Sequence, residues 1–299
     1  MSSRDLDAFP TDDDEVAAFV ADLGLDGIVD LHVHALPARM QDAVWRFFDS
    51  LTDPPWPIEY RLDLDDQLTT LASLGVVAHT ALAYPHKPGM LDWLNGFTLD
   101  LADRVDAVIP TFTLFPEDGV DEAVAAAIAR GGAVVKAHVQ VGRYHLSDPR
   151  LDGAWTQVED AGVAVMAHVT ATYGVGGGDE VCGVDHVRDL LERHPDLTVM
   201  IAHVGLPDHA DAVALAEDTP RVLLDVSGAL IERDMHRIPP DVVARMAAIP
   251  DQIVFGSDFP STPYSFADQV RGLAPLELDD AGLRDVLAGT ARRLLQGRR

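Results

Sequence analysis

The feature that most constrains the fold is a series of eight short runs rich in Val, Ile and Ala, each followed by a polar or helical segment. Each run is too short and too continuously apolar for an amphipathic helix, so it is typical of a strand buried on both faces of a parallel sheet. The runs cover residues 27–34, 76–84, 107–115, 133–139, 163–168, 197–203, 222–227 and 253–258.

Helical patterns fill the intervals between the runs. They are clearest at residues 121–130, 185–194, 239–248 and 279–296, where glycine or proline marks an end or acidic residues open the first turn. From His34 to Asp258 the chain advances 258 − 34 = 224 residues in seven intervals, an average of 32, about one strand–helix unit. The pattern predicts an α/β protein, a (β/α)8 TIM barrel.

The first interval is the longest, and it contains the sequence TDPPWPIEY within residues 35–65. Its prolines argue against a helix, so we expect an extended first βα loop over the mouth of the barrel. The alternative fold is an open doubly wound sheet, but the first strand is not followed by the expected GxGxxG. No interdomain linker is evident. We therefore expect a disordered acidic lead-in at residues 1–14 and a single barrel domain at residues 15–299.

Charge and cysteine content narrow the classes of function. Lys and Arg number 22 and Asp and Glu 49, a net charge of −27, which disfavours nucleic acids and anionic membranes as partners. Cys182 is the single cysteine, so neither an internal disulfide nor a thiolate zinc site is available. The N-terminus lacks the apolar stretch of a signal peptide, and no run is long enough for a membrane helix. We expect a cytoplasmic protein that acts on a small molecule, and the sequence leaves homo-oligomer formation open.

Residues able to bind a metal or carry a proton recur where the predicted strands end. His32 and His34 stand two apart at the end of the first run, so their side chains share one face of a strand. The fifth, sixth and eighth runs end in His168, His203 and Asp258. Lys136 and His138 lie in the fourth run, again two apart.

The barrel would bring these residues together, because parallel strands present their carboxyl ends to one mouth. Imidazole nitrogens and a carboxylate suit zinc, iron or manganese. A single His-x-His pair occurs by chance, and a lone histidine at a strand end is more often a satisfied polar group. The joint pattern, in apolar contexts where unpartnered polar groups are costly, predicts a metal centre.

The series DLHVH, KAH, MAH, IAHVG and FGSDFP resembles the amidohydrolase superfamily, in particular the amidohydrolase-related (amidohydrolase 2) branch that also includes ACMSD-like decarboxylases. The resemblance runs from about Gly27 to Leu295. It implies one divalent metal per subunit, Zn²⁺ first with Mn²⁺ or Fe²⁺ as alternatives. The implied metal ligands are His32, His34, His168 and Asp258, and the implied catalytic residues are Asp258 and His203.

Two further residues bear on the number of metal ions. Lys136 falls where binuclear members of the superfamily carry a carboxylated lysine that bridges two metals, so Lys136 and His138 are candidates for a second metal or for substrate. No second carboxylate is evident to hold another ion, which favours one metal.

The resemblance and the residues together predict a metal-dependent hydrolase. It would cleave a C–N or C–O bond of an amide, lactone or ester-like carbonyl compound through a metal-activated water. The alternative is a nonoxidative decarboxylase of an aromatic or unsaturated acid, and a third reading is a non-catalytic metal-binding protein. We expect Arg143, His145 and Tyr173, in loops after strands, to contact substrate, although Arg143 could instead pair with a surface carboxylate.

Overall fold

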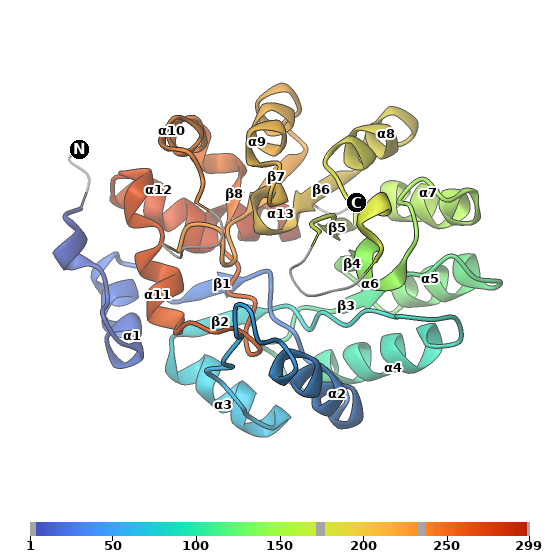
Figure 1. The fold of residues 1–299 in the computed structure, drawn as a ribbon, viewed down its shortest axis with the longest axis horizontal. Coiled ribbons are helices and arrows are strands. Elements are labelled where there is room, and N and C mark those ends of the chain that lie inside the picture. Colours follow the sequence, from blue (N-terminus) through green and yellow to red (C-terminus); the bar gives the residue numbers. More distant parts are fainter. Residues whose placement is uncertain (1–3, 172–176, 232–236, 298–299) are drawn as a thin grey trace.

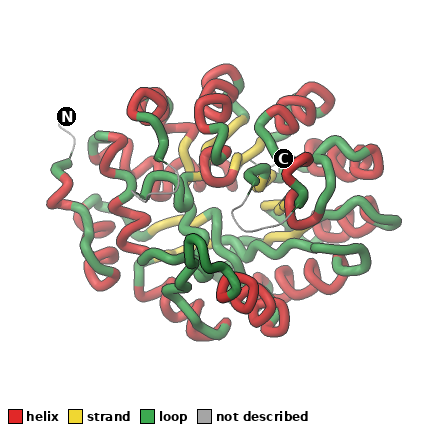
Figure 2. The backbone as a smooth tube through the Cα atoms, viewed as in Figure 1, coloured by secondary structure: helices red, strands yellow, loops and turns green. Residues whose placement is uncertain are grey.

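A computed structural model describes residues 4–171, 177–231 and 237–297. Eight short parallel strands stand in the middle of the molecule, and helices surround them (Figures 1 and 2). The predicted (β/α)8 barrel is confirmed. The strands are β1 Ile28–Asp30, β2 Val76–His79, β3 Thr111–Thr113, β4 Val134–His138, β5 Ala164–His168, β6 Thr198–Ile201, β7 Val222–Asp225 and β8 Ile253–Val254.

The strand order follows the chain. β1 pairs with β2, and β3 to β8 form a six-stranded sheet in sequence order, with every pair parallel. Backbone hydrogen bonds also cross the two seams between these sheets. The His79 amide donates to the Ala107 carbonyl at 2.8 Å, and the Leu31 amide donates to the Phe255 carbonyl at 3.0 Å. The carboxyl ends of the strands therefore meet at one mouth.

Most of the helices that follow the strands cover the outside of the barrel (Figure 1), and the four predicted helical segments are confirmed. The segment predicted at 279–296 consists of two α-helices joined by a π-helical turn at Asp285–Gly289. The helices are α1 Asp13–Asp22, α2 Ala38–Asp49, α3 Leu64–Ser73, α4 Leu91–Ala102, α5 Val120–Ala129, α6 Val139–Gly142, α7 Asp152–Asp160, α8 Asp185–Arg193, α9 His209–Asp218, α10 Pro240–Ala247, α11 Phe266–Arg271, α12 Asp280–Arg284 and α13 Thr290–Gln296.

The strands are apolar on both faces because each face packs against apolar groups. Met166 and Met200 point into a cluster inside the barrel, while Phe112 and Trp155 belong to the larger cluster between strands and helices. Trp155 is fully buried, and its Nε1 donates to the Leu146 carbonyl at 2.8 Å. Among the described residues, no helix combines the length and apolarity needed to cross a bilayer.

The segment after β1 differs from the prediction. Helix α2 occupies residues 38–49, although the sequence argued against a helix between residues 35 and 65. The prolines do not interrupt it, because Pro37 immediately precedes its first residue and the others follow its end. The apolar side chains of α2 recur at helical spacing. This spacing indicates a helix, but the nearby cluster of prolines was given more weight in the prediction.

The start of the chain also differs from the predicted disordered lead-in. Phe9 is buried against Phe19, with ring centroids 5.2 Å apart. Arg4 forms ion pairs with Asp22 and Asp280 at 2.7 and 2.6 Å. Residues 4–14 therefore have a defined place, because an apolar anchor and a cation within the acidic run fasten them to the barrel.

Candidate metal centre

The side chains singled out by the sequence lie in the last residues of the strands or just beyond the strand ends. β1 ends at Asp30, so His32 and His34 belong to the segment that follows it, and Asp258 lies four residues past the end of β8. His203 and Asp258 have left-handed backbones, with φ of 54° and 58°. Such conformations are costly for residues other than glycine and concentrate at functional sites, where the surrounding structure holds them. Here the Asp258 amide donates to the His32 carbonyl at 2.8 Å.

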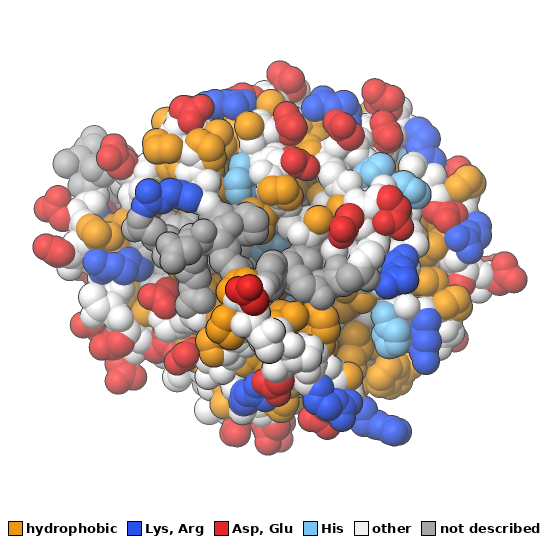
Figure 3. Space-filling view, in the orientation of Figure 1, with side chains coloured by type: hydrophobic (Ala, Val, Ile, Leu, Met, Phe, Trp, Pro, Cys, Tyr) orange, Lys and Arg blue, Asp and Glu red, His pale blue; other side chains and the backbone are white. Residues whose placement is uncertain are grey.

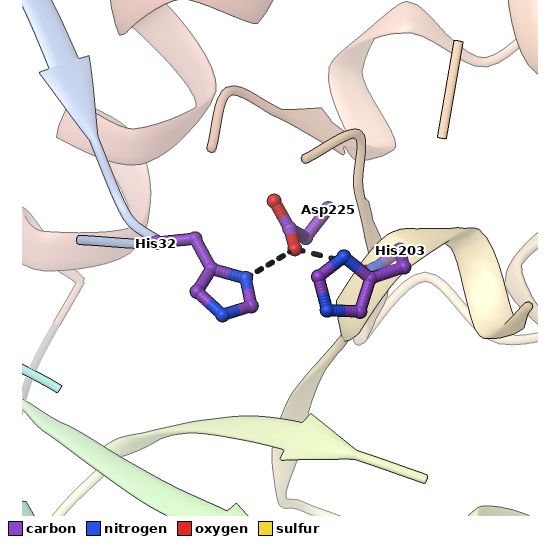
Figure 4. A group of neighbouring side chains, drawn as sticks. All are labelled: His32, His203 and Asp225. Atoms are coloured by element: carbon purple, nitrogen blue, oxygen red, sulfur yellow. Dashed lines mark hydrogen bonds and ion pairs between the residues drawn. The ribbon is translucent and has the colours of Figure 1, made fainter. Parts of the chain in front are cut away.

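His32 is completely buried and held through its Nδ1 atom. This nitrogen lies 2.6 Å from Oδ2 of Asp225, and Figure 4 shows Asp225 between His32 and His203. Burial is the main cause that lowers the pKa of His32 well below its usual value, and the positive charge of Lys136 lowers this pKa further. A neutral His32 donates its Nδ1 hydrogen to the carboxylate. The Nε2 atom is then left with a lone pair that points into the mouth.

His34 has the same arrangement with a different acceptor. Its Nδ1 donates to the Leu82 carbonyl at 3.0 Å, because a carbonyl oxygen can only accept. Its Nε2 lies 3.1 Å from Oδ1 of Asp258, and that oxygen is also 3.5 Å from His32 Nε2. In a neutral His34, Nε2 and the carboxylate oxygen are both acceptors. The distance between these two atoms suits a shared proton or a metal ion between them.

The residues present fit a divalent metal. His32, His34 and Asp258 each offer one ligand atom, and these atoms lie within 4.8 Å of one another. Two imidazole nitrogens and a carboxylate oxygen form a donor set that suits zinc, manganese or iron. A carboxylate or a carbonyl fixes the other nitrogen of each ring, the usual way in which proteins orient histidine ligands.

A second cluster, His32, His203 and Asp225, also has ligand atoms within 4.8 Å, but hydrogen bonds account for its short distances. Oδ2 of Asp225 accepts from His32 Nδ1, from the Ser227 hydroxyl at 2.6 Å and from the His203 amide at 3.3 Å. This carboxylate has the role of orienting the histidines around it.

His203 lies where the sixth strand ends and lines the mouth of the barrel. Its Nδ1 is 2.8 Å from the Ser227 carbonyl and therefore donates to it, which leaves Nε2 with a lone pair. The centres of the His32 and His168 rings lie 5.0 and 4.9 Å from that of His203. His203 is thus placed beside the candidate metal ligands, with one nitrogen available to exchange a proton.

His168 is brought to the same mouth but not into the three-atom cluster. Its ring stacks on that of His138, with centroids 3.9 Å apart and planes at 18°. Burial lowers the pKa of both rings well below the usual value, so both are neutral at physiological pH. Nδ1 of His138 has no hydrogen-bond partner among the described residues. The role of His168 as a ligand stays a prediction, and so does that of His138.

Lys136 is completely buried beneath the histidines. Its Nζ lies 3.1 Å from His32 Nε2, and burial lowers the pKa of the amine to about 8, against the attraction of Asp258 and Asp225. The lysine therefore reaches the same lone pair that a metal at His32 would use. Its predicted part in a second metal site is not tested by this geometry.

Two functional carboxylates were not recognised in the sequence. Asp225 accepts from the backbone amides of Ser227 and His203, and it also holds the His32 ring from across the barrel. Asp30 accepts from the amides of His32 and Ser257 at 3.0 and 3.1 Å, and burial raises its pKa to about 7. Each aspartate is the last residue of an otherwise apolar strand, and this position was the signal in the sequence that could have identified it. The contact between Asp225 and His32 could not be predicted, because the two residues lie 193 positions apart in the sequence.

A cavity of about 1080 Å³ opens above the histidines. One side of it is formed by α2 and by the Pro54–Trp56 segment, which we call the apolar wall. Arg143 lines the cavity, and its contact with substrate stays a prediction. The described lining does not include His145, and Tyr173 lies outside the described residues. The described lining comprises His34, Leu36, Arg39, Met40, Ala43, Val44, Phe47, Phe48, Pro54, Pro55, Trp56, Tyr84, His86, Met90, Trp93, His138, Gln140, Val141, Arg143, His168, Thr170, His203, Leu206, Ser227, Gly228, Ala229, Ile231, Asp258, Ser261, Pro263 and Tyr264.

Together, the fold and the cluster define a (β/α)8 barrel with a candidate metal centre at its mouth. The amidohydrolase family model matches residues 29–297, and the chain belongs to this family, as the sequence motifs had indicated. The chain is accordingly an enzyme of the amidohydrolase superfamily. No curated protein matches it.

Solved structures with the same fold include three that cover most of this chain. An uncharacterized TIM-barrel protein from Bordetella bronchiseptica has a TM-score of 0.70 at 17% identity, covering 90% of this chain and 98% of its own. A manganese complex of 5-carboxyvanillate decarboxylase from Novosphingobium aromaticivorans has a TM-score of 0.64 at 16% identity, with 92% and 97% covered. A protein described as a 2-pyrone-4,6-dicarboxylic acid hydrolase from Pseudomonas putida has a TM-score of 0.61 at 18% identity, with 91% and 98% covered.

Proposed function

We propose that this protein is a metal-dependent hydrolase that cleaves a C–N or C–O bond of an amide, lactone or ester-like carbonyl compound. The observation that carries the proposal is the convergence of His34 Nε2, Asp258 Oδ1 and His32 Nε2, three ligand atoms that lie within 4.8 Å of one another. Membership of the amidohydrolase family supports the same reading.

A divalent cation held by these atoms would act as a Lewis acid toward a carbonyl oxygen and toward water. The protein's own residues supply the rest of the chemistry. Asp225 and the Leu82 carbonyl hold the two imidazoles with their Nε2 atoms toward the mouth. His203 keeps its Nε2 lone pair beside the cluster, where it can take a proton from the attacking water or polarise the substrate through the protonated ring.

Asp258 is the second proton carrier. Burial alone would raise the pKa of this carboxyl group, but the hydrogen bond to His34 and the neighbouring imidazoles hold it well below its usual range. The carboxylate is therefore ionised near neutral pH and presents one oxygen to the histidines. The proposal gives Asp258 two functions, as a ligand and as an acceptor for a proton of the attacking water.

A second candidate reaction is nonoxidative decarboxylation of an aromatic or unsaturated acid. It is favoured by the similarity to 5-carboxyvanillate decarboxylase, which was solved with manganese. On this scaffold a proton first taken up by Asp258 or His203 would be delivered to the carbon that bears the carboxyl group, and the C–C bond to that group would then break to release CO₂. The proposed cofactor is one divalent metal ion per chain, Zn²⁺ first with Mn²⁺ or Fe²⁺ as alternatives. We propose a single ion because the described residues around His32 include no further carboxylate beyond those assigned.

Product analysis separates the two reactions. The purified chain is loaded with Zn²⁺ or Mn²⁺ and incubated with panels of lactones, amides and aromatic acids, and products are identified by mass spectrometry in ¹⁸O-labelled water. Hydrolysis predicts a product that has gained one labelled water, whereas decarboxylation predicts release of CO₂ with the rest of the substrate intact.

The His203→Gln variant tests the assigned proton carrier on whichever substrate turns over. We expect kcat to fall by about 10²–10⁴-fold, the usual contribution of acid–base catalysis. His194→Gln is a matched control, because His194 is buried at the end of α8 beside Glu159, away from the cavity. An unchanged kcat in His203→Gln would remove this residue from the mechanism.

A further inference from the structure

The apolar wall faces the cavity with side chains that would normally face a core. Met40, Val44 and Phe48 recur at four-residue intervals on α2, with Ala43 and Phe47 beside them, and all five line the cavity. An apolar stripe on a surface helix ordinarily packs against the protein interior. Here the first half of the stripe does so through Met40 and Val44. The second half, at Phe47 and Phe48, is partly exposed to the cavity.

The wall is fastened to the loop that carries Asp258. Trp56 stacks on Phe48, with ring centroids 5.4 Å apart and planes at 18°, and Trp56 Nε1 donates to the Ser261 carbonyl at 2.9 Å. Gln41 Nε2 donates to the Ser261 hydroxyl at 3.1 Å. These contacts hold the aromatic side chains of the wall at a fixed position relative to the candidate metal centre. Binding sites require such preorganisation.

The molecule as a whole is strongly acidic, but the described lining of the cavity has more arginines than acidic residues. The chain has a net charge of −27, and acidic side chains are spread around the edge of the face seen in Figure 3. Yet among the cavity-lining residues that the structure describes, Asp258 alone is acidic, and Arg39 and Arg143 are basic. Arg39, in the first turn of α2, is exposed and forms no hydrogen bond or ion pair with any described residue.

We infer that the substrate is an amphipathic organic anion, with a bulky apolar body against the wall and an anionic group at Arg39. A cavity of about 1080 Å³ lies slightly above the range of about 300–1,000 Å³ usual for small-molecule sites. A small acid would leave Phe47 and Phe48 in water. The inference rests on the proposed function only for the reacting carbonyl, which would lie at the histidines while the remainder of the substrate occupies the wall.

Binding of straight-chain alkyl sulfonates tests the inference without turnover. Hexane-, heptane- and octanesulfonate carry an anion that is a poor metal ligand, and octan-1-ol is the neutral comparison. Isothermal titration calorimetry on the full chain, as purified and after metal loading, should give about fourfold tighter binding per added methylene. Naphthalene-2-sulfonate shows whether the body is better matched by a ring than by a chain.

Two substitutions separate the two parts of the site. Arg39→Gln should weaken the binding of octanesulfonate about fivefold, since an exposed ion pair contributes at most about that factor to affinity. The dependence of affinity on chain length should not change. Arg46→Gln is its control, because Arg46 is exposed on the same helix but is not in the described lining. Phe48→Ser should reduce the dependence of affinity on chain length, whereas Phe48→Leu should retain it. Trp45→Ser is the control for Phe48→Ser, because Trp45 also lies on α2 but is outside the described lining.

The outcomes are distinct from those of the proposed function. If the chain binds no metal but keeps the chain-length dependence, the proposed function fails and the amphipathic site stands. If affinity is the same from hexane- to octanesulfonate, or Arg39→Gln binds like Arg46→Gln, the inference is overturned whatever the metal content. Unfolding temperatures of all variants, measured alongside, identify any variant whose loss of binding comes from misfolding.

Discussion

The histidines at the strand ends and the side chains of α2 line one cavity, but the two regions are held in different ways. The floor, which consists of His32, His34, His203 and Asp258, is fixed by buried hydrogen bonds from neighbouring strand ends. The wall is held by apolar contact, one aromatic stack and two hydrogen bonds to Ser261. The difference suggests a division of labour in which the barrel fixes the chemistry and the segment after β1 selects the substrate.

The largest expected difference between barrel and wall is in stability. Trp155→Ala removes a fully buried ring and should lower the free energy of unfolding by about 3–5 kcal/mol. Trp56→Ala removes a partly exposed ring with one stack and one hydrogen bond, so we expect a loss of about 1–2 kcal/mol. Urea unfolding of both variants measures the two values. Equal losses would mean that the wall is as integral to folding as the barrel.

Metal affinity should respond to the floor and not to the wall. Asp225→Asn removes the carboxylate that accepts from His32 Nδ1, and loss of such a partner typically costs 10–100-fold in metal affinity. Competition with a chromophoric chelator measures this change. Phe48→Ser, in the wall, should bind metal like the wild type. The control for the floor is Asp196→Asn, at an exposed ion pair with Arg221 before β6. An Asp225→Asn affinity equal to that of the control would show that the buried carboxylate does not orient the ligand.

The smallest effect is expected where wall and floor meet. Ser261→Ala leaves Gln41 Nε2 without its hydroxyl partner, so stability should fall by about 1 kcal/mol. With the wall less firmly placed, KM should rise while kcat stays near the wild-type value, because the floor is unchanged. Ser50→Ala, at the exposed end of α2, is the control. A fall in kcat without a change in KM would place Ser261 in the chemistry instead.

The sequence predicted the barrel and the residues of the floor for the same reason. Strands buried on both faces must be apolar throughout, so the eight runs stand out, and a histidine or aspartate at the end of such a run is conspicuous. Contacts across the barrel could not be predicted in this way. Asp225 closes an apolar run like other candidates, but only the arrangement of the strands around the barrel brings it to His32.

The wall was predicted less well because two local signals conflict there. A cluster of prolines indicated a loop, while the apolar spacing of residues 40, 44 and 48 is that of a helix. The helix can form because the prolines lie outside it, and its apolar side chains line the cavity. At the N-terminus the acidic composition concealed Phe9 and Arg4, whose contacts with Phe19, Asp22 and Asp280 depend on tertiary structure.

The most direct test of the account is the metal content of the chain, measured by elemental analysis after loading and extensive dialysis. The wild type should retain about one equivalent of zinc or manganese, and His34→Ala should lose it while its circular dichroism spectrum stays that of the wild type. His168→Ala, measured in parallel, decides whether that predicted ligand belongs to the same site. A wild-type chain that retains no metal, or a His34→Ala variant that retains a full equivalent, would contradict the assignment of the floor as a metal centre.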